Sequence, residues 1–440
     1  MGHDLSQDAE IWDDAYKLDR AHVFHSWHAQ RNLDPTEVVT GHGVWLKYGD
    51  GREMLDFTSQ QVNVNIGYQH PKVIEGIKKQ AELLCTVGPD YANLARGRAA
   101  SLVARRAPEG FDKVFFTNAG ADANENAMRA ARLFTGRDKI LSSYRCYHGN
   151  TGAAISATGD WRRKPNDYSR GHVHFFTPYL YRSEFSATTQ EEECERALAH
   201  LEHVIQFEGP DTIAAVLLES VPGTAGIIIP PKDYFKGVRE ITKKYSILMI
   251  TDEVMAGFGR TGFWFALDDY DYTPDIISFA KGCNSGYVAA RRDYERPGGP
   301  PLRRHRLPRR PDLLRSPAGH GRHRGHPGSH GRGAHRRQRL HHRQGRARPA
   351  AHRSVRQAPE DRRGSRQGRV LGRGNGCRPH HQGAAGRRTM KQIVAEGDKR
   401  GLILGVHNNR IHVTPPCVIS ADEATQGVEI LDQVLTAAGC

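Results

Sequence analysis

Apolar positions recur with two periods along most of the chain and predict strands that alternate with helices. Short runs rich in branched apolar residues predict buried strands, and longer stretches with apolar residues three or four positions apart predict amphipathic helices. Strands are expected at 114–117, 139–143, 213–218, 246–251 and 276–279, and helices at 70–84, 122–134 and 232–245. This alternation favours a mostly parallel sheet with helices on both faces.

The two ends of the chain add further elements. Residues 43–56 contain a Gly-Asp-Gly turn between alternating segments and predict a β-hairpin. From Met390 onward, a helix, a short strand near 411–413 and a final helix from about Ala421 predict part of a second α/β unit.

The formal net charge of +14 is concentrated in one segment, from Ala289 to Thr389. It holds 28 arginines, no lysine and five acidic residues, a net charge of +23 that leaves −9 for the rest of the chain. It also holds 11 histidines but no Phe, Trp or Ile, and it has neither the strand period nor the helix period. This composition is typical of disordered, low-complexity sequence.

Three interpretations of the segment compete. An Arg/His-rich arm could bind nucleic acid, although such arms usually contain lysine and lie at termini. Its histidines could bind a metal, but they follow no ligand spacing. The interpretation that we favour is a stretch of a GC-rich gene translated in the wrong reading frame, since such frames yield Arg, Gly, Pro, Ala and His.

Back-translation with free choice of wobble bases supports the reading-frame interpretation. Read one nucleotide later, residues 309–331 can encode GGLTYSGHPLATAAIVATLEAMA, whose second half has helical periodicity. The same offset lets residues 376–386 encode AVDPTTKEPLV. Two sensible peptides from one offset are hard to obtain by chance.

Other features bear on compartment and partners. The start, MGHDLSQDAEIW, lacks the basic and apolar regions of a signal peptide, and no apolar run approaches the roughly 20 residues that span a bilayer. The seven cysteines are scattered without a C-x-x-C pair, which argues for a reducing compartment and against a zinc site. We therefore expect a cytoplasmic protein with no metal, membrane or nucleic-acid partner.

Polar motifs follow three of the predicted strands, where parallel sheets bind ligands. In VFFTNAGADANENA (114–127), Gly120 permits a tight turn into a helix whose free N–H groups and dipole suit a phosphate. An ordinary strand-to-helix turn with Asp122 as a cap is the alternative.

The other two motifs supply an acid and an amine. Asp252 ends the strand in ILMITDEVMAGFGRTG, and a buried carboxylate there needs a partner such as a pyridinium nitrogen or an arginine. Lys281 ends the strand in DIISFAKG, where partial burial would lower its pKa and keep it nucleophilic; the alternative is a lysine that reaches solvent. Together, the three motifs suit a phosphorylated pyridine aldehyde.

These motifs and the Y-H-G at 147–149 resemble those of class III aminotransferases, the ω-aminotransferase group of fold-type I enzymes that use pyridoxal 5′-phosphate (PLP). The resemblance runs from about His25 to Val288 and from Met390 to the end. It implies an α/β fold of type I with a large mostly parallel domain and a smaller, incomplete α/β domain. The implied ranges are 1–55 and 390–440 for the small domain, 56–288 for the large PLP-binding domain, and 289–389 for the anomalous segment.

The resemblance also implies roles for residues around the cofactor ring. Lys281 would carry PLP covalently and move the proton between substrate and cofactor. Asp252 would pair with the pyridine nitrogen, Tyr147 would stack on the ring beside the cofactor-binding candidate His148, and Val254 would press on the opposite face.

Further roles concern the phosphate and the substrate. Gly120 and Ala121 would donate backbone N–H groups to the phosphate, and Glu219 would lie near the cofactor. Arg410, in NRIHVTPP, would hold a substrate carboxylate, which a planar guanidinium suits.

The implied reaction moves an amino group to a keto acid by a ping-pong mechanism in a homodimer. An ω-amino acid, a diamine or a taurine-like sulfonate would be the donor, and pyruvate the acceptor. Two departures matter: the chain has ESVPG at 219–223 where the family commonly has EPVQG, and it lacks the T-Y-S-G-H-P-like motif that only the back-translated peptide contains. A catalytically impaired remnant and a nucleic-acid-binding fusion therefore stand as alternatives.

Overall fold

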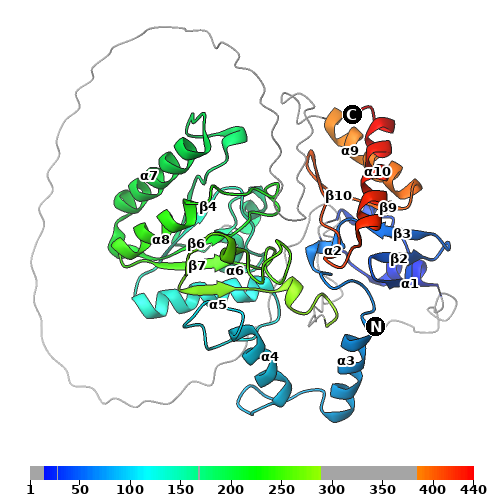
Figure 1. Ribbon diagram of the computed structural model, residues 1–440, viewed down its shortest axis with the longest axis horizontal. Helices are drawn as coiled ribbons and strands as arrows, with labels where there is room; N and C mark the ends of the chain where they lie inside the picture. Colours follow the sequence, from blue (N-terminus) through cyan, green and yellow to red (C-terminus); the bar gives the residue numbers. More distant parts are fainter. Residues whose placement is uncertain (1–13, 27, 167–168, 289–383) are drawn as a thin grey trace, which may run out of the picture. The chain divides into compact units, whose positions relative to one another are not determined.

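A five-stranded parallel sheet forms the centre of the larger part of the fold (Figure 1). The computed structural model describes residues 14–26, 28–166, 169–288 and 384–440. The strands run in the order β5 (His172–Phe175), β4 (Lys139–Ser143), β6 (Ile213–Glu219), β7 (Leu248–Asp252) and β8 (Ile276–Ser278). Every neighbouring pair is parallel, so the predicted sheet type is confirmed.

Helices cover both faces of this sheet because successive side chains of a strand point to opposite sides. Val216 and Leu218 of β6 share a buried cluster with α7 (Gln190–Glu208) and α8 (Tyr234–Lys244). Ala215 and Leu217 share another cluster with α5 (Gly120–Thr135) and α6 (Gly152–Ala157) (Figure 1). The central strand β6 is therefore apolar at nearly every position and buried throughout.

A smaller sheet joins the two ends of the described chain. β1 (Val38–His42), β2 (Trp45–Tyr48) and β3 (Glu53–Asp56) pair antiparallel, and β9 (Leu402–Ile403) adds a parallel strand beside β3. β10 (Gly405–His407) and β11 (Arg410–His412) form a separate hairpin.

Two C-terminal helices complete the core of this smaller unit. α9 (Ala384–Lys399) contributes Ile393, and α10 (Ala421–Ala437) contributes Val434, to a cluster that contains Phe57. α9 begins at Ala384, inside the segment 289–389, so its last six residues are helical; the disorder predicted for 289–383 lies outside the described residues.

The other described α-helices lie before the central sheet in the sequence. They are α1 (Ala15–His22), α2 (Ser59–Val62), α3 (Pro71–Leu83) and α4 (Leu94–Ala104). No helix among the described residues combines the length and the apolar character that crossing a membrane requires.

Most predicted elements are confirmed within three residues of their expected bounds, but the strand at 114–117 is wrong. This segment pairs with no described strand, and the side chain of Phe115 is 71% exposed. The Val-Phe-Phe run favours an extended chain, but a strand also needs a neighbour to bond to. The sequence reading also missed α4, α6, α7 and β5.

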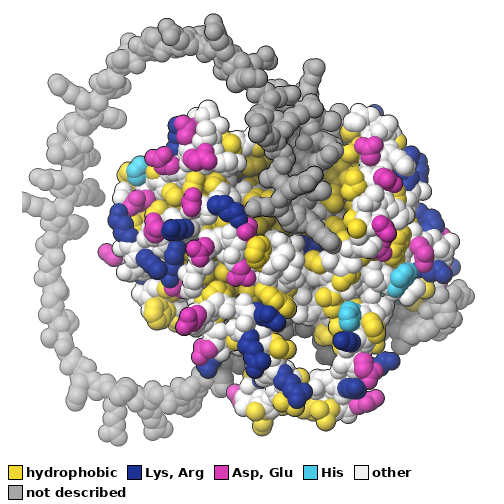
Figure 2. Space-filling model, in the orientation of Figure 1, with side chains coloured by type: hydrophobic (Ala, Val, Ile, Leu, Met, Phe, Trp, Pro, Cys, Tyr) yellow, Lys and Arg dark blue, Asp and Glu magenta, His cyan; other side chains and the backbone are white. Residues whose placement is uncertain are grey.

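Several large apolar side chains are exposed on α3, α4 and the chain between them. Leu83, Tyr91, Leu94 and Leu102 are each more than 60% exposed, and Figure 2 shows apolar side chains among charged ones over these helices. Exposed apolar residues that cluster in this way are typical of surfaces that bind another protein.

Gly427 provides a test of the packing of the smaller unit. A Cβ at Gly427 in α10 would lie 1.9 Å from the ring of Phe57, whereas a Cβ at Gly76 in α3 would meet nothing within 4 Å. We expect Gly427→Ala to lower the free energy of unfolding by about 1–3 kcal/mol through overpacking. The control Gly76→Ala should raise it by about 0.5–1 kcal/mol through helix propensity. Urea unfolding of both variants is the measurement, and equal shifts would contradict the packing described here.

Candidate active site

The polar motifs meet at the carboxyl ends of three adjacent strands. The register places Glu219 beside Asp252 and Asp252 beside Ser278, and Lys281 follows three residues later. Glu219 and Asp252 both act electrostatically on the Lys281 amine, so the acid and the amine lie together as predicted.

Asp252 is a buried carboxylate that is held from three sides. Its Oδ2 accepts hydrogen bonds from Nδ2 of Asn124 and from Nδ1 of His148, both at 2.7 Å. Its Oδ1 accepts the backbone N–H of Val254 at 2.9 Å. With only 3% of its surface exposed, Asp252 relies on these donors in place of water.

Asn124, on α5, orients this carboxylate. Its Nδ2 also donates to the carbonyl of His148 at 2.8 Å, and its Oδ1 accepts the hydroxyl of Ser278 at 2.6 Å. One side chain therefore connects α5, β7, β8 and the Y-H-G segment. The sequence reading missed Asn124, because an asparagine in a helix carries no signal of a tertiary role.

His148 is the second side chain that contacts the Asp252 carboxylate. Its ring is fully buried, and Nε2 has no hydrogen-bond partner among the described residues. Burial opposes the charged ring, but the Cys146 sulfur and the Asp252 carboxylate outweigh burial and raise the pKa of His148 well above its usual value.

Glu219 fixes the backbone that carries Tyr147. Its two carboxylate oxygens accept the N–H groups of Tyr147 at 2.8 Å and Gly223 at 2.9 Å, and burial raises the pKa of the Glu219 carboxyl. The Tyr147 ring lies under the guanidinium of Arg162, 4.1 Å from the ring centroid. Burial raises the pKa of Tyr147 to about 12, so its phenol is neutral near pH 7.

The predicted anion cradle lies beside these groups. α5 begins at Gly120, so the first N–H groups of a 16-residue helix have no partner within the helix. A Cβ at Gly120 would lie 2.8 Å from the side chain of Val254 and 3.4 Å from Ala280, and one at Gly149 would lie 2.6 Å from Ala121. Gly120, Ala121 and Val254 are thus in one place with the residue before Lys281.

Lys281 is a partly buried lysine on a constrained backbone. It has φ +46°, in the left-handed region, and begins a short 3₁₀ turn. Its Nζ makes no hydrogen bond or ion pair within the part of the chain that the structure describes. Burial lowers the pKa of the amine, which the nearby acids partly oppose.

Arg410 lies on β11, and its guanidinium has no carboxylate partner among the described residues. Its Nη2 donates to the carbonyl of Thr224 at 3.2 Å, and its buried Nε has no partner in the described structure. A Cβ at Gly226 would lie 2.7 Å from its Nη1, so this glycine leaves room for the guanidinium. Burial lowers the pKa of Arg410.

Arg162 is a second cation of this region, which the sequence reading did not single out. It pairs with Asp160, and its Nη2 donates to the hydroxyl of Thr224 at 3.1 Å. Arg162 and Arg410 therefore contact the same threonine, one through the side chain and the other through the backbone.

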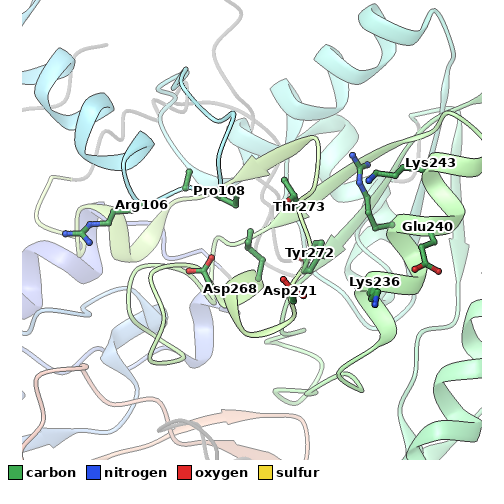
Figure 3. A pocket seen from close by; sticks show the side chains of 12 residues that line it. Arg106, Pro108, Lys236, Glu240, Lys243, Asp268, Asp271, Tyr272 and Thr273 are labelled. Carbon is green, nitrogen blue, oxygen red and sulfur yellow. The ribbon is translucent and has the colours of Figure 1, made fainter.

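A separate pocket lies away from these residues. Figure 3 shows it between α8, which supplies Lys236, Glu240 and Lys243, and the short 3₁₀ helix η6 (Ala266–Asp269) with the residues after it, which supply Asp268 and Asp271. Its charged groups are of both signs, and it contains none of the residues around Lys281. Among the described residues, no group of three or more His, Cys, Asp or Glu is placed to hold a metal ion.

Comparison with known proteins identifies the family of this chain. Residues 28–293 match the family model of class-III aminotransferases, and the chain belongs to this family. The arginine-rich segment begins at Ala289, directly after Val288, and the family match ends within its first five residues. The reading-frame interpretation stays a prediction.

Curated relatives match over part of their length. The taurine–pyruvate aminotransferase of Bilophila wadsworthia is 34% identical over 284 residues, which cover 62% of this chain and 61% of that protein. The hypotaurine/taurine–pyruvate aminotransferase of Paracoccus denitrificans is 37% identical over 286 residues, with the same coverage. The chain thus matches about three fifths of the length of these relatives.

Solved structures confirm the fold. An (S)-enantioselective omega-transaminase from Thermomicrobium roseum superposes with a TM-score of 0.74 at 24% identity, covering 97% of this chain and 98% of that one. The taurine:2-oxoglutarate aminotransferase from Bifidobacterium kashiwanohense, solved with PLP and glutamate, gives 0.72 at 27% identity, covering 96% and 97%. The fold is the fold-type I α/β architecture that the sequence motifs imply.

The environment of Lys281 predicts an unusual reactivity. Burial lowers the pKa of this amine, whereas the hydrogen bond to Glu202 raises the pKa of Lys244 on α8. In protein freed of bound carbonyl compounds, Lys281 should therefore react with an amine reagent at lower pH than Lys244. Peptide mass spectrometry after labelling across a pH series measures both residues in one sample. A midpoint for Lys281 at or above that of Lys244 would contradict the description.

Proposed function

We propose that this chain is a PLP-dependent aminotransferase that moves an amino group from a primary amine or ω-amino acid to a keto acid such as pyruvate. The observation that carries the proposal is the meeting of Lys281 with the hydrogen-bonded Asp252 at adjacent strand ends. Membership of the class-III aminotransferases supports it.

The donors and acceptors of the site fit PLP. A carboxylate offers about four acceptor positions, and Asp252 uses three of them for Asn124, His148 and Val254. One position remains for a protonated pyridine nitrogen. The start of α5 at Gly120 and Ala121 offers N–H groups to a phosphate, and Lys281 offers an amine to an aldehyde.

When bound, PLP supplies an electron sink for the charge that develops at the substrate α-carbon. Asp252 favours the protonated pyridine nitrogen, since a buried negative charge stabilises a cation beside it. Lys281, whose pKa is lowered by burial, takes up and returns the proton at the α-carbon. Tyr147 offers a ring face for stacking, and Val254 and Glu219 form other walls of the site.

The substrate end of the site favours acids. Arg410 has no carboxylate partner among the described residues, and Arg410 and Arg162 both donate hydrogen bonds to Thr224. This arrangement supports a donor with a distal acidic group, an ω-amino acid or an aminosulfonate of the kind named for the two curated relatives. Donor and keto acid would use the same residues in turn, which gives ping-pong kinetics.

The assembly and the domain ranges belong to the same proposal. A homodimer would cover the exposed side chains of Leu83, Tyr91, Leu94 and Leu102. Residues 56–288 would form the cofactor-binding domain, and 1–55 with 390–440 the smaller one. The cytoplasmic location predicted from the cysteine pattern stays a prediction.

Removal of Lys281 tests the proposal directly. With PLP added, the chain should show the visible absorbance of a covalently held cofactor, and Lys281→Ala should lose this band and about 10²–10⁴-fold in kcat. Lys244→Ala, on the exposed face of α8, is the control and should change neither quantity. If the unaltered chain holds PLP but does not transaminate, it is an impaired remnant; if it holds no PLP, the proposal fails.

A variant of Arg410 tests the acid-binding end. Arg410→Lys keeps the positive charge but loses the planar pair of donors, so KM for the keto acid should rise about ten- to a hundredfold. KM for a primary amine with an uncharged tail should change little. Steady-state kinetics with both substrates provide the comparison. An equal rise for both would show that Arg410 only supports the fold.

A further inference from the structure

Asn65 is a buried asparagine that contacts residues after β7 of the large sheet and a residue of the C-terminal segment. Its Nδ2 donates to the carbonyl of Phe258 at 2.9 Å, and its Oδ1 accepts Nη2 of Arg260 at 2.9 Å. Its backbone carbonyl accepts the N–H of Cys417 at 2.7 Å. Only 2% of its surface is exposed, so it lies inside the protein with every side-chain polar atom bonded.

The amide of Asn65 lies directly against the residue after Lys281. A Cβ placed on Gly282 would lie 2.3 Å from Nδ2 of Asn65 and 3.0 Å from Cβ of Phe258. The amide has no freedom to move away, because Arg260 and Phe258 hold its two ends. A glycine, which has no Cβ, is therefore the residue that fits at position 282 against this amide.

Lys281 needs such support because of its backbone. A lysine at φ +46° lies in the left-handed region, which is strained for a residue with a side chain and persists only where the surroundings impose it. The neighbouring chain supplies further support: Ser285 Oγ accepts the N–H of Ile66 at 3.0 Å, and Tyr287 donates to the carbonyl of Gly67 at 2.8 Å. Residues 65–67 therefore lie alongside residues 282–287.

Arg260 holds Asn65 from the other side. Its guanidinium also donates to Ser59 Oγ at 2.9 Å and to the carbonyl of Pro415, and 4% of its surface is exposed. No carboxylate forms an ion pair with Arg260 among the described residues, and the Arg260 charge helps to lower the pKa of Lys281. The other charged groups that act on the Lys281 amine are Glu219, Asp252 and Arg162, and Lys281 in turn acts on His407.

We infer that Asn65, held by Arg260, is a positioning residue that fixes the backbone of Lys281 and Gly282 and so keeps the lysine amine in its buried place. The inference rests on the proposed function only in taking Lys281 as the reactive amine. It adds a determinant that lies in another segment of the chain and acts through the backbone of Lys281 and Gly282.

The test compares the reactivity of Lys281 in variants of the full chain freed of bound cofactor. Asn65→Ala should shift the labelling midpoint of Lys281 to higher pH, toward that of Lys244, because the released turn lets the amine reach water. Ser59→Ala is the matched control: it removes another bond of Arg260 but leaves the contact between Asn65 and Gly282. It should lower the midpoint of thermal unfolding without moving the labelling midpoint.

Gly282→Ala probes the same contact from the other side and gives the same readout if Asn65→Ala does not fold. The double variant should lose less stability than the two single losses added together, since Asn65→Ala makes room for the new methyl group. Unchanged labelling in Asn65→Ala, or in Gly282→Ala where only that variant folds, would overturn the inference, as would additive losses. Because labelling needs neither PLP nor turnover, failure of the aminotransferase proposal would be seen separately.

Discussion

The burial of the Asp252 carboxylate at the end of β7 is the constraint on which the site depends. A charge in this place requires donors, and Asn124, His148 and the backbone of Val254 provide them. These donors come from α5, from the segment after β4 and from the turn after β7, so meeting the needs of one carboxylate fixes three segments. The strand ends then present an acid, an amine and a helix N-terminus to one space, as ligand sites in parallel sheets do.

The amine is held by a different set of contacts. Lys281 lies on a left-handed backbone after β8, and Asn65 occupies the space against Gly282. Arg260 connects Asn65 to Ser59, which follows β3 of the smaller sheet, and to Pro415, which follows the β10–β11 hairpin. The acid is therefore organised within the large sheet, whereas the position of the amine also depends on chain segments from the smaller unit.

Local sequence pattern predicted much of this structure, and tertiary contacts account for the rest. The strands β4, β6, β7 and β8 follow from apolar runs, and the meeting of Asp252 with Lys281 follows from parallel strands that end at one edge. The strand predicted at 114–117 was wrong because an apolar run does not show whether a neighbouring strand exists. Asn124, Arg162 and Asn65 could not be found, since their contacts lie with residues far away in the sequence.

We propose that Lys281, and no other lysine, carries the cofactor. The most direct measurement is borohydride reduction of the full chain with PLP, followed by peptide mass mapping. The structure predicts that the reduced cofactor adds to the peptide that contains Lys281, and that Asp252→Ala weakens this addition. Cofactor spread over exposed lysines such as Lys244, with Lys281 unmodified, would contradict the account.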